Sequence, residues 1–324
     1  MNENLNRKTK TGLGDFIMSN QITHSFLMIE PIAFGFNNQT AVNNYFQQKE
    51  KLDFSAVQQL ALDEFNSMVA KLQANDIEIF VVKDTEDPHT PDSIFPNNWI
   101  SFHGDGQVVL YPMFAENRRQ ERRKDIMDYL IKQGCTIKNI DDFTFWETQN
   151  LFLEGTGSMV FDRENRIAYA ALSERTDKFV FLQFCKVFEY KPVYFSSNQS
   201  VGGVRLPVYH TNVMLSIASE YAVICADCID DACERKMVIE SLEKSGKELI
   251  LIDENQMNNF AANVLQVENK LGKRFMVISQ TAYNSLHEKQ IECLRKYNEL
   301  IVIPIPIIEK VAGGSVRCMM AEIY

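Results

Sequence analysis

Apolar and polar residues follow one another along the chain in a way that predicts helices, each followed by a short buried strand. Within residues 54–74, Val57, Ala61 and Phe65 fall at helical spacing. The apolar run that follows, IEIFVV, ends at Val82 and indicates a buried strand. The same order recurs, so we predict five helices, each followed by a strand, at 54–74, 117–133, 177–189, 233–245 and 285–297.

Between these helix–strand pairs lie stretches that predict β-hairpins. The clearest spans 98–112, where the turn-forming run HGDG separates two apolar arms. Further turns are expected near 162–165, 219–220 and 269–272. The repeating unit is therefore strand, strand, helix, strand, over roughly 50 to 65 residues. No linker rich in Gly, Pro or Ser interrupts the series, so we expect one α/β domain over 22–324.

One position in each unit carries a residue that could take part in chemistry. The residues that open the successive hairpins are separated by 56, 56, 53 and 55 positions. Equivalent positions in a closed ring of repeats point at one axis, so we expect these side chains to meet in a central channel. They include a thiol, an imidazole and a carboxylate, which are the groups that a nucleophilic site requires. In chain order the residues are Asn98, Glu154, His210, Asn263 and Cys318.

Composition narrows the class of protein. The 324 residues are 45% hydrophobic, which is enough for a large core, and the formal net charge of −10 argues against a general nucleic-acid binder. No apolar run is long enough to span a membrane, so none is expected to do so. Residues 1–21 lack the apolar centre of a signal peptide and are expected to form a loosely attached extension.

The seven cysteines are scattered and odd in number, which favours a reducing cytoplasm over a disulfide framework. Cys225, Cys228 and Cys233 resemble part of a metal site, but zinc usually requires four ligands and no second pair is present. We therefore expect neither a metal nor a cofactor. A small molecule is the expected partner, and a homodimer is compatible with the sequence.

Several runs of sequence together resemble the pentein superfamily of guanidino-group-modifying enzymes. They are PDSIFPNNW (91–99), LEGTGSMVFD (153–162), ALSERT (171–176), YHTNV (209–213) and GGSVRCM (313–319). The likeness covers nearly all of the chain from about residue 22 and is greatest to dimethylarginine dimethylaminohydrolases and related citrulline-utilisation hydrolases. It implies a five-bladed α/β propeller of ββαβ repeats around a central channel.

The resemblance also implies a catalytic set. It places the nucleophile on Cys318, the acid–base group on His210 and a carboxylate on Glu154. Arg175, in the SERT run, matches an arginine that binds the substrate carboxylate. A second such arginine matches Arg118 or its neighbour at 119.

The substrate-binding pattern departs from the family at two positions. Dimethylarginine enzymes carry the pattern D-x-x-F-x-E-D, and Asp92 and Phe95 match its first two defined residues. The two final acids are replaced by Asn97 and Asn98. Asn263 completes the expected substrate-binding set through its place in the repeat.

These residues suit attack by a thiolate on a carbon bonded to several heteroatoms. His210 can donate a proton to the departing amine and then activate water, and Glu154 can hold the substrate nitrogens. A neutral Asn offers both a donor and an acceptor, so it suits a neutral ureido group. We therefore expect hydrolysis of citrulline to ornithine. Three alternatives stay open: hydrolysis of arginine or methylarginine, amidinotransfer to an amine, and a catalytically silent binding protein of the same fold.

Overall fold

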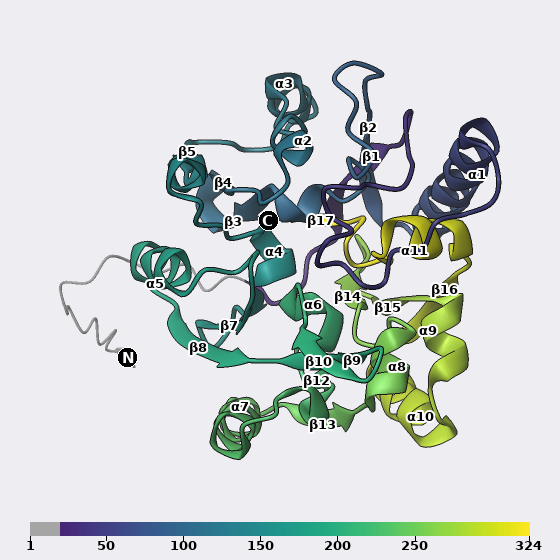
Figure 1. Cartoon of the computed structure of the whole chain (residues 1–324). Coiled ribbons are helices and arrows are strands. Elements are labelled where there is room, and N and C mark those ends of the chain that lie inside the picture. The colour runs from purple at the N-terminus through teal and green to yellow at the C-terminus, as the bar shows by residue number, and fades with distance from the viewer. Residues whose placement is uncertain (1–19) are drawn as a thin grey trace, which may run out of the picture.

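The computed structural model describes residues 20–324 (Figure 1). Its strands are β1 (Ser25–Glu30), β2 (Glu78–Lys83), β3 (Ile100–His103), β4 (Gln107–Leu110), β5 (Asn139–Asp142), β6 (Val160–Asp162), β7 (Ile167–Leu172), β8 (Lys191–Ser196), β9 (Asn198–Val201), β10 (Val204–Pro207), β11 (Leu215–Ile217), β12 (Tyr221–Ile224), β13 (Glu248–Leu251), β14 (Leu265–Glu268), β15 (Arg274–Ser279), β16 (Glu299–Ile303) and β17 (Ala321–Ile323). Its α-helices are α1 (Phe54–Gln73), α2 (Glu116–Arg119), α3 (Lys124–Lys132), α4 (Gly155–Ser158), α5 (Lys178–Val187), α6 (Thr211–Met214), α7 (Ala232–Lys244), α8 (Glu254–Asn258), α9 (Gln280–Ser285), α10 (Glu288–Tyr297) and α11 (Pro306–Ala312).

Within residues 20–324, the strands form five three-stranded sheets and one separate hairpin. In each sheet two strands pair antiparallel, and the third pairs parallel after a helical crossover. The first sheet, β17-β1-β2, joins the two ends of the described chain. The others are β3-β4-β5, β6-β7-β8, β11-β12-β13 and β14-β15-β16. The predicted mixed α/β class and the repeated strand order are both present.

The sheets are distributed around the middle of the molecule, and the longer helices lie outside them (Figure 1). The first strands of neighbouring sheets contact one another: β17 contacts β3, and β11 contacts both β6 and β14. Each of the five positions predicted to open a hairpin lies just before one of these first strands. This arrangement directs five loop ends toward a common region.

Short polar side chains define where several helices begin. Asp53, Asp177 and Asp231 each accept hydrogen bonds from backbone N–H groups in the first turn of α1, α5 and α7. Such caps satisfy donors that have no partner inside the helix. Asp253 forms a capping box with Gln256 at the start of α8. These caps explain why the helices begin so close to the predicted boundaries.

One predicted helix is broken in the structure, and another begins later than predicted. The helix predicted at 117–133 is divided into α2 and α3, and this break leaves Arg118 buried while α3 lies outside. The helix predicted at 285–297 corresponds to α10, which begins at Glu288, where the Gln290 side chain accepts from the backbone N–H of His287; α9 ends at Ser285 and precedes it. The strand that follows this helix, β16, ends at Ile303. Pro304 has no N–H to donate to a neighbouring strand, and Pro306 begins α11.

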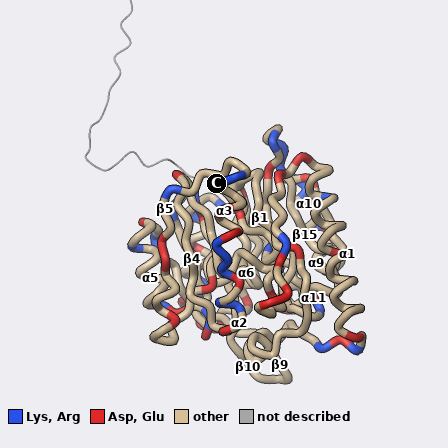
Figure 2. The backbone as a smooth tube through the Cα atoms, turned by 90° about the horizontal axis from the view of Figure 1, so that it is seen from above, with Lys and Arg blue, Asp and Glu red and all other residues tan. Residues whose placement is uncertain are grey.

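A hairpin that the sequence pattern did not reveal is formed by β9 and β10. Gly202 and Gly203 both adopt positive φ at its turn, a conformation that two-residue hairpin turns require. Figure 2 shows the hairpin at one end of the molecule, and it also shows acidic and basic residues interspersed over the chain.

The extension predicted over residues 1–21 includes one residue, Gln21, that packs into the domain. Gln21 is buried, and its amide nitrogen donates to the carbonyl oxygens of Phe161 and Ile217. The rest of the predicted extension, apart from exposed Asn20, lies outside the described residues. Among residues 20–324, no helix is both long and apolar enough to cross a membrane.

The buried face of α1 shows how the outer helices are held. Val57, Ala61, Phe65, Met68 and Leu72 recur every three or four residues and are buried. They belong to a core cluster that also contains Phe26 and Met28 of β1 and Cys318. The same apolar cluster therefore supports both the helix and the loop that carries the predicted nucleophile.

We expect Phe65→Ala to lower the free energy of unfolding by about 3–5 kcal/mol, because it leaves a cavity in this cluster. Leu60→Ala is the matched control on the same helix: Leu60 is 39% exposed, so its loss should cost no more than about 0.5 kcal/mol. Urea denaturation of both variants measures the difference. Equal losses would show that α1 is not anchored through Phe65.

Candidate active site

A small cavity brings together residues from the loops and short helices that connect the strands. Seven of its lining residues were predicted from the sequence, and the others include Asn44, Tyr209, Ala312 and Gly314. Its volume of about 10 Å³ is room for about one water molecule. The seven predicted residues that line it are Asp92, Phe95, Asn98, Arg118, Arg175, His210 and Cys318.

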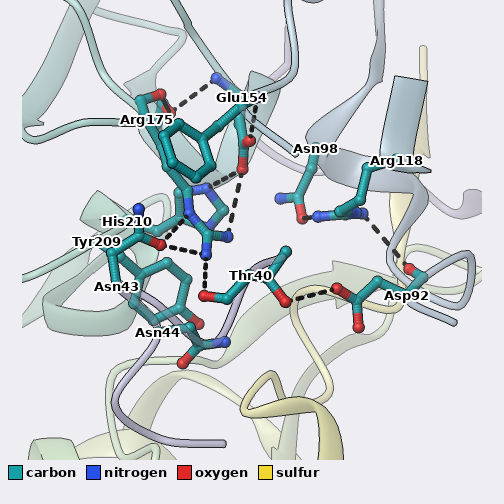
Figure 3. Close-up of polar contacts among 12 residues, drawn as sticks. Thr40, Asn43, Asn44, Asp92, Asn98, Arg118, Glu154, Arg175, Tyr209 and His210 are labelled. Carbon is teal, nitrogen blue, oxygen red and sulfur yellow. Dashed lines mark hydrogen bonds and ion pairs between the residues drawn. The ribbon is translucent and has the colours of Figure 1, made fainter. Parts of the chain in front are cut away.

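Glu154 lies at the start of α4 and is fully buried. Its Oε2 is 2.7 Å from Nε2 of His210 and 3.6 Å from the Arg175 guanidinium (Figure 3). Its Oε1 accepts a 2.9 Å hydrogen bond from the backbone N–H of Phe114. A buried carboxylate needs such partners to remain ionised.

The charges of this pair follow from their surroundings. Burial tends to raise the pKa of Glu154, but the charge of Arg175 and the hydrogen bond from His210 outweigh it and lower the pKa to about 2. Burial lowers the pKa of His210 to about 4, against the opposing hydrogen bond and charge of Glu154. At neutral pH the site therefore holds a carboxylate beside a neutral imidazole. Because a carboxylate only accepts, we assign the imidazole proton to Nε2, which leaves a lone pair on Nδ1.

Two amide groups face the sulfur of Cys318, which is buried just before β17. The side-chain nitrogen of Asn263 is 3.2 Å from the sulfur, and that of Asn212 is 3.5 Å from it. Donors at these positions can stabilise a thiolate. Asn263 does not line the cavity; it lies behind the sulfur. Sequence reasoning missed Asn212, although it lies two residues after His210 within the YHTNV run.

Asn98 has a fixed orientation. Nη1 of Arg118 donates to its Oδ1 at 2.7 Å, so the amide oxygen points toward the arginine (Figure 3). Its amide nitrogen is buried and has no hydrogen-bond partner among the described residues. Arg118 is itself held by two hydrogen bonds to Glu121, at 2.8 and 2.9 Å. The structure thus presents a hydrogen-bond donor at the cavity.

In each of two predicted pairs of neighbouring residues, 118/119 and 97/98, only one residue lines the cavity. Of the two candidate arginines, Arg118 lines the cavity, whereas Arg119 donates to the carbonyl oxygens of Met113 and Phe114. Asn97 does not line the cavity, and its amide nitrogen donates to the Thr156 hydroxyl at 3.2 Å. Adjacent asparagines therefore face different surroundings.

The segment 31–53, between β1 and α1, supplies residues that sequence reasoning missed. Asn43 accepts hydrogen bonds from Arg175, and the carbonyl oxygen of Thr40 accepts another at 2.8 Å. The Thr40 hydroxyl also donates to Oδ2 of Asp92 at 3.1 Å, while Oδ1 of Asp92 has no partner among the described residues (Figure 3). The segment has no periodic pattern, so only the structure could place it over the cavity.

Two glycines allow the close approach of α4 to the 3-10 turn Pro96–Asn98. Gly155 has a φ of 48°, and a Cβ there would lie 2.3 Å from the carbonyl oxygen of Asn97. A Cβ on Gly157 would lie 2.5 Å from the Asn98 amide nitrogen and 2.8 Å from the His210 ring. A side chain at Gly155 would displace the backbone of the 3-10 turn, and one at Gly157 would separate Asn98 from His210.

The three cysteines that resemble part of a metal site lie outside the cavity. The sulfurs of Cys225 and Cys228 are 3.3 Å apart within the core. Among residues 20–324, no group of three or more His, Cys, Asp or Glu side chains could hold a metal ion.

Comparison with known proteins identifies the family. A family model described as "N,N dimethylarginine dimethylhydrolase, eukaryotic" matches residues 30–324. The chain belongs to this family. The predicted resemblance to dimethylarginine hydrolases is confirmed. No curated protein matches the chain.

Solved structures show the same mixed α/β fold at low identity. The apo arginine dihydrolase ArgZ of the cyanobacterial ornithine–ammonia cycle is 17% identical with a TM-score of 0.70, over 92% of this chain and 40% of that one. The substrate-bound N-terminal domain of a cysteine-to-serine ArgZ mutant gives 16% and 0.69, over 92% and 97%. DDAH from Pseudomonas aeruginosa, complexed with citrulline, gives 16% and 0.62, over 93% and 99%. The present chain thus spans 40% of the ArgZ chain in the apo structure.

We expect the His210 imidazole to stay neutral down to mildly acidic pH and to titrate near pH 4, because burial disfavours its charged form. Glu154→Gln should lower the pH midpoint of the His210 titration, since the carboxylate favours the imidazolium. Arg175→Gln should raise that midpoint, since the guanidinium charge disfavours the imidazolium. Imidazole nitrogen chemical shifts measured against pH would report both changes.

The same pKa has a consequence for stability. Between the ordinary value of 6.5 and about 4, the unfolded chain binds a proton at His210 that the folded chain does not. The free energy of unfolding should therefore decrease as the pH falls through that window. A midpoint near 6.5, unchanged in both variants, would contradict the arrangement of charges described here.

Proposed function

We propose that this protein is a cysteine hydrolase that converts citrulline to ornithine, ammonia and carbon dioxide. The observation that carries this proposal is the amide nitrogen of Asn98, a residue that lines the cavity: this nitrogen is buried and has no acceptor among residues 20–324. Arg118 has only donors, so its hydrogen bond fixes the amide oxygen on its own side. A guanidinium also has only donors, whereas a ureido oxygen accepts. The neutral group is therefore the better match for Asn98.

The first chemical step uses Cys318 and His210. Nδ1 of His210 takes the thiol proton, and the sulfur attacks the ureido carbon. The bond from that carbon to the chain nitrogen then breaks, and Nδ1 returns the proton to the departing nitrogen. Ornithine leaves, and a carbamoyl group remains on the sulfur. Glu154 stabilises the imidazolium that forms between the two proton transfers, through its 2.7 Å contact with Nε2.

The second step removes the carbamoyl group. His210 takes a proton from water, and the water oxygen adds to the carbamoyl carbon. The carbon–sulfur bond breaks, the thiol regains its proton, and the carbamate that leaves decomposes to ammonia and carbon dioxide. The amide nitrogens of Asn212 and Asn263 support the sulfur each time it carries negative charge.

The amino-acid end of the substrate needs groups of both charges. Oδ1 of Asp92 is a free acceptor for the α-ammonium group, and Arg175 can bind the carboxylate in a bidentate fork. In the present structure Arg175 is paired with Glu154 and with Asn43. Since the cavity holds about one water molecule, binding requires Arg175 and the segment 31–53 to move.

Arginine or methylarginine is the second candidate substrate. Glu154 is a fully buried carboxylate beside the cavity and could pair with a guanidinium in place of Arg175. The family description names dimethylarginine, and ArgZ is named an arginine dihydrolase. Such a substrate leaves the Asn98 donor without an acceptor, which is why we rank it second.

We extend the proposal to the architecture and setting of the enzyme. The five three-stranded sheets are interpreted as the blades of a five-bladed propeller around a central channel, with 22–324 as one catalytic domain. A small amino acid as partner, a cytoplasmic location and a homodimer remain predictions. So do the absence of a cofactor and of nucleic-acid binding.

Incubation of the purified protein with citrulline, arginine or methylarginine, with separate assays for ornithine, citrulline and released amine, tests the function. We expect ornithine from citrulline and none from the Cys318→Ser variant. Turnover of methylarginine alone would refute the citrulline assignment. A new guanidino compound formed when glycine is supplied would indicate amidinotransfer, and full biological activity of Cys318→Ser would indicate a non-catalytic protein.

The two adjacent asparagines provide a matched test of specificity. Asn98→Asp replaces the donor at the cavity with a carboxylate, so we expect the ratio of kcat/KM for citrulline to that for arginine to fall by about 10-fold or more. Asn97→Asp makes the same change in charge one residue earlier, at a side chain outside the cavity. It should leave the ratio nearly unchanged. Equal effects of the two variants would remove Asn98 as the specificity determinant.

A further inference from the structure

Another small cavity lies between the first strands of four of the sheets. Residues of β6, β11, β14 and β17 line it, together with residues next to those strands, among them Arg163, Asn212 and Arg317. Its volume is about 30 Å³, which is room for about two water molecules. It shares no lining residue with the catalytic cavity, so it is a separate site.

Three charged side chains line this cavity, and their charges do not balance. Arg317 donates to Glu322 at 2.6 Å, so these two residues pair with each other. Arg163 is 3% exposed, and its guanidinium has no hydrogen-bond or ion-pair partner among residues 20–324. The acidic residue that precedes it, Asp162, is paired with Lys247 at 3.5 Å. One buried positive charge is therefore left without a counter-charge in contact with it.

Two aromatic rings hold Arg163 in place without using its hydrogen-bond donors. The guanidinium carbon is 4.2 Å from the centroid of the Tyr324 ring and 5.0 Å from that of the Phe161 ring. Contacts of this kind involve the positive charge and leave the N–H groups free to donate. None of the three nitrogens is fully enclosed without a partner, so the unpaired donors reach the surface of the cavity that Arg163 lines.

A guanidinium with free donors in a small cavity matches an anion of a few atoms. A buried charge is stable when it is both paired and hydrogen-bonded. The guanidinium fork suits a planar oxyanion, which it can bind through two parallel hydrogen bonds. Because the charges of Arg317 and Glu322 cancel, one positive charge remains to be neutralised, which favours a monovalent anion.

We propose that this cavity binds a small planar monovalent oxyanion, of which formate, nitrate and bicarbonate are examples, on the guanidinium of Arg163. Among residues 20–324, no thiol or imidazole lines the cavity. The anion is therefore a bound ligand and not a second substrate.

The position of this cavity connects it to the nucleophile. Asn212 lines it, and the amide nitrogen of the same residue is 3.5 Å from the Cys318 sulfur. Two more lining residues are neighbours in sequence of that site: Arg317 precedes Cys318, and Val264 follows Asn263. A bound anion would thus lie beside the segments that carry the nucleophile and both of its amide donors. The proposed hydrolysis of citrulline releases carbon dioxide, which hydrates to bicarbonate, an anion of this class; only this last link rests on the proposed function.

Saturation-transfer NMR of formate with the full chain tests the proposal. Formate has one carbon-bound proton to observe and no ureido or guanidino group, so the result does not depend on the proposed hydrolysis. We expect formate to bind, and nitrate and bicarbonate to displace it, because each is a planar oxyanion with one negative charge. Sulfate, which is larger and divalent, should not displace it. Absence of formate binding, or displacement by sulfate as effective as that by nitrate, overturns the proposal.

Two arginines of one turn locate the site. Arg163→Gln should weaken formate binding by about 10-fold or more, because the charge-assisted hydrogen bonds are lost. Arg166→Gln is the matched control: Arg166 lies over the Tyr190 ring and donates to the carbonyl oxygen of Phe188, but it does not line the cavity, so binding should be retained. Thermal melting of both variants separates loss of the site from loss of the fold.

A third variant keeps the proposal testable if Arg163→Gln does not fold. Glu322 is the only acidic residue among 20–324 that lines the cavity. Glu322→Gln removes that negative charge and frees Arg317, so formate should bind more tightly, by about 3-fold or more. Unchanged or weaker binding in this variant would contradict the proposal.

The catalytic cavity also contains guanidinium groups, so the site of binding must be distinguished from it. Formate binding that Arg175→Gln abolishes and Arg163→Gln leaves intact would place the anion in the catalytic cavity and overturn the assignment. Failure of the protein to hydrolyse citrulline would overturn the proposed function and leave the anion site as it stands.

Discussion

A single buried carboxylate determines much of the arrangement of this site. Glu154 has no access to solvent, so it stays ionised only because a backbone N–H, an imidazole and a guanidinium surround it. Those three partners come from three different parts of the chain. Each is fixed in turn, and Arg175 reaches the carboxylate only because Asn43 and Thr40 hold it from the segment 31–53. The interactions that keep this one buried charge stable therefore also connect the sheets to the segment 31–53.

The same constraint explains the protonation of the site. Burial, helped by two nearby guanidinium groups, lowers the pKa of His210 to about 4 against the opposing charge of Glu154, so the imidazole is neutral. A neutral imidazole can accept a proton from the thiol of Cys318, which an imidazolium could not do. Asn98 supplies an amide where the resemblance to dimethylarginine enzymes implies an acid, and it is oriented by Arg118 instead of by the substrate. The donor of Asn98 and the acceptor of His210 are therefore set before any ligand arrives.

Features of the fold and the site that follow from a repeat in the sequence could be predicted, and features that depend on tertiary contacts could not. The spacing of Asn98, Glu154, His210, Asn263 and Cys318 predicted their convergence, because a repeat fixes which residues begin the first strand of each sheet. Spacing does not fix side-chain direction, so it could not distinguish Asn98 at the cavity from Asn263 behind the sulfur. The segment 31–53 has no periodicity, and its contacts with Arg175 arise only from tertiary structure. The broken helix at 117–133 was missed for a related reason: its helical pattern continues through the point where Arg118 turns inward.

The two glycines of α4 bear on any attempt to redesign the pocket. They bring the backbone of this helix against the neighbouring 3-10 turn so closely that no additional atom fits between Asn98 and His210. That wall of the cavity cannot be moved outward without displacing two reactive side chains together. The opposite wall consists of an irregular segment and a helix end, with a large empty volume behind them. An engineer who wishes to admit a bulkier substrate would therefore vary Tyr45 and Phe46 and leave the glycine wall untouched.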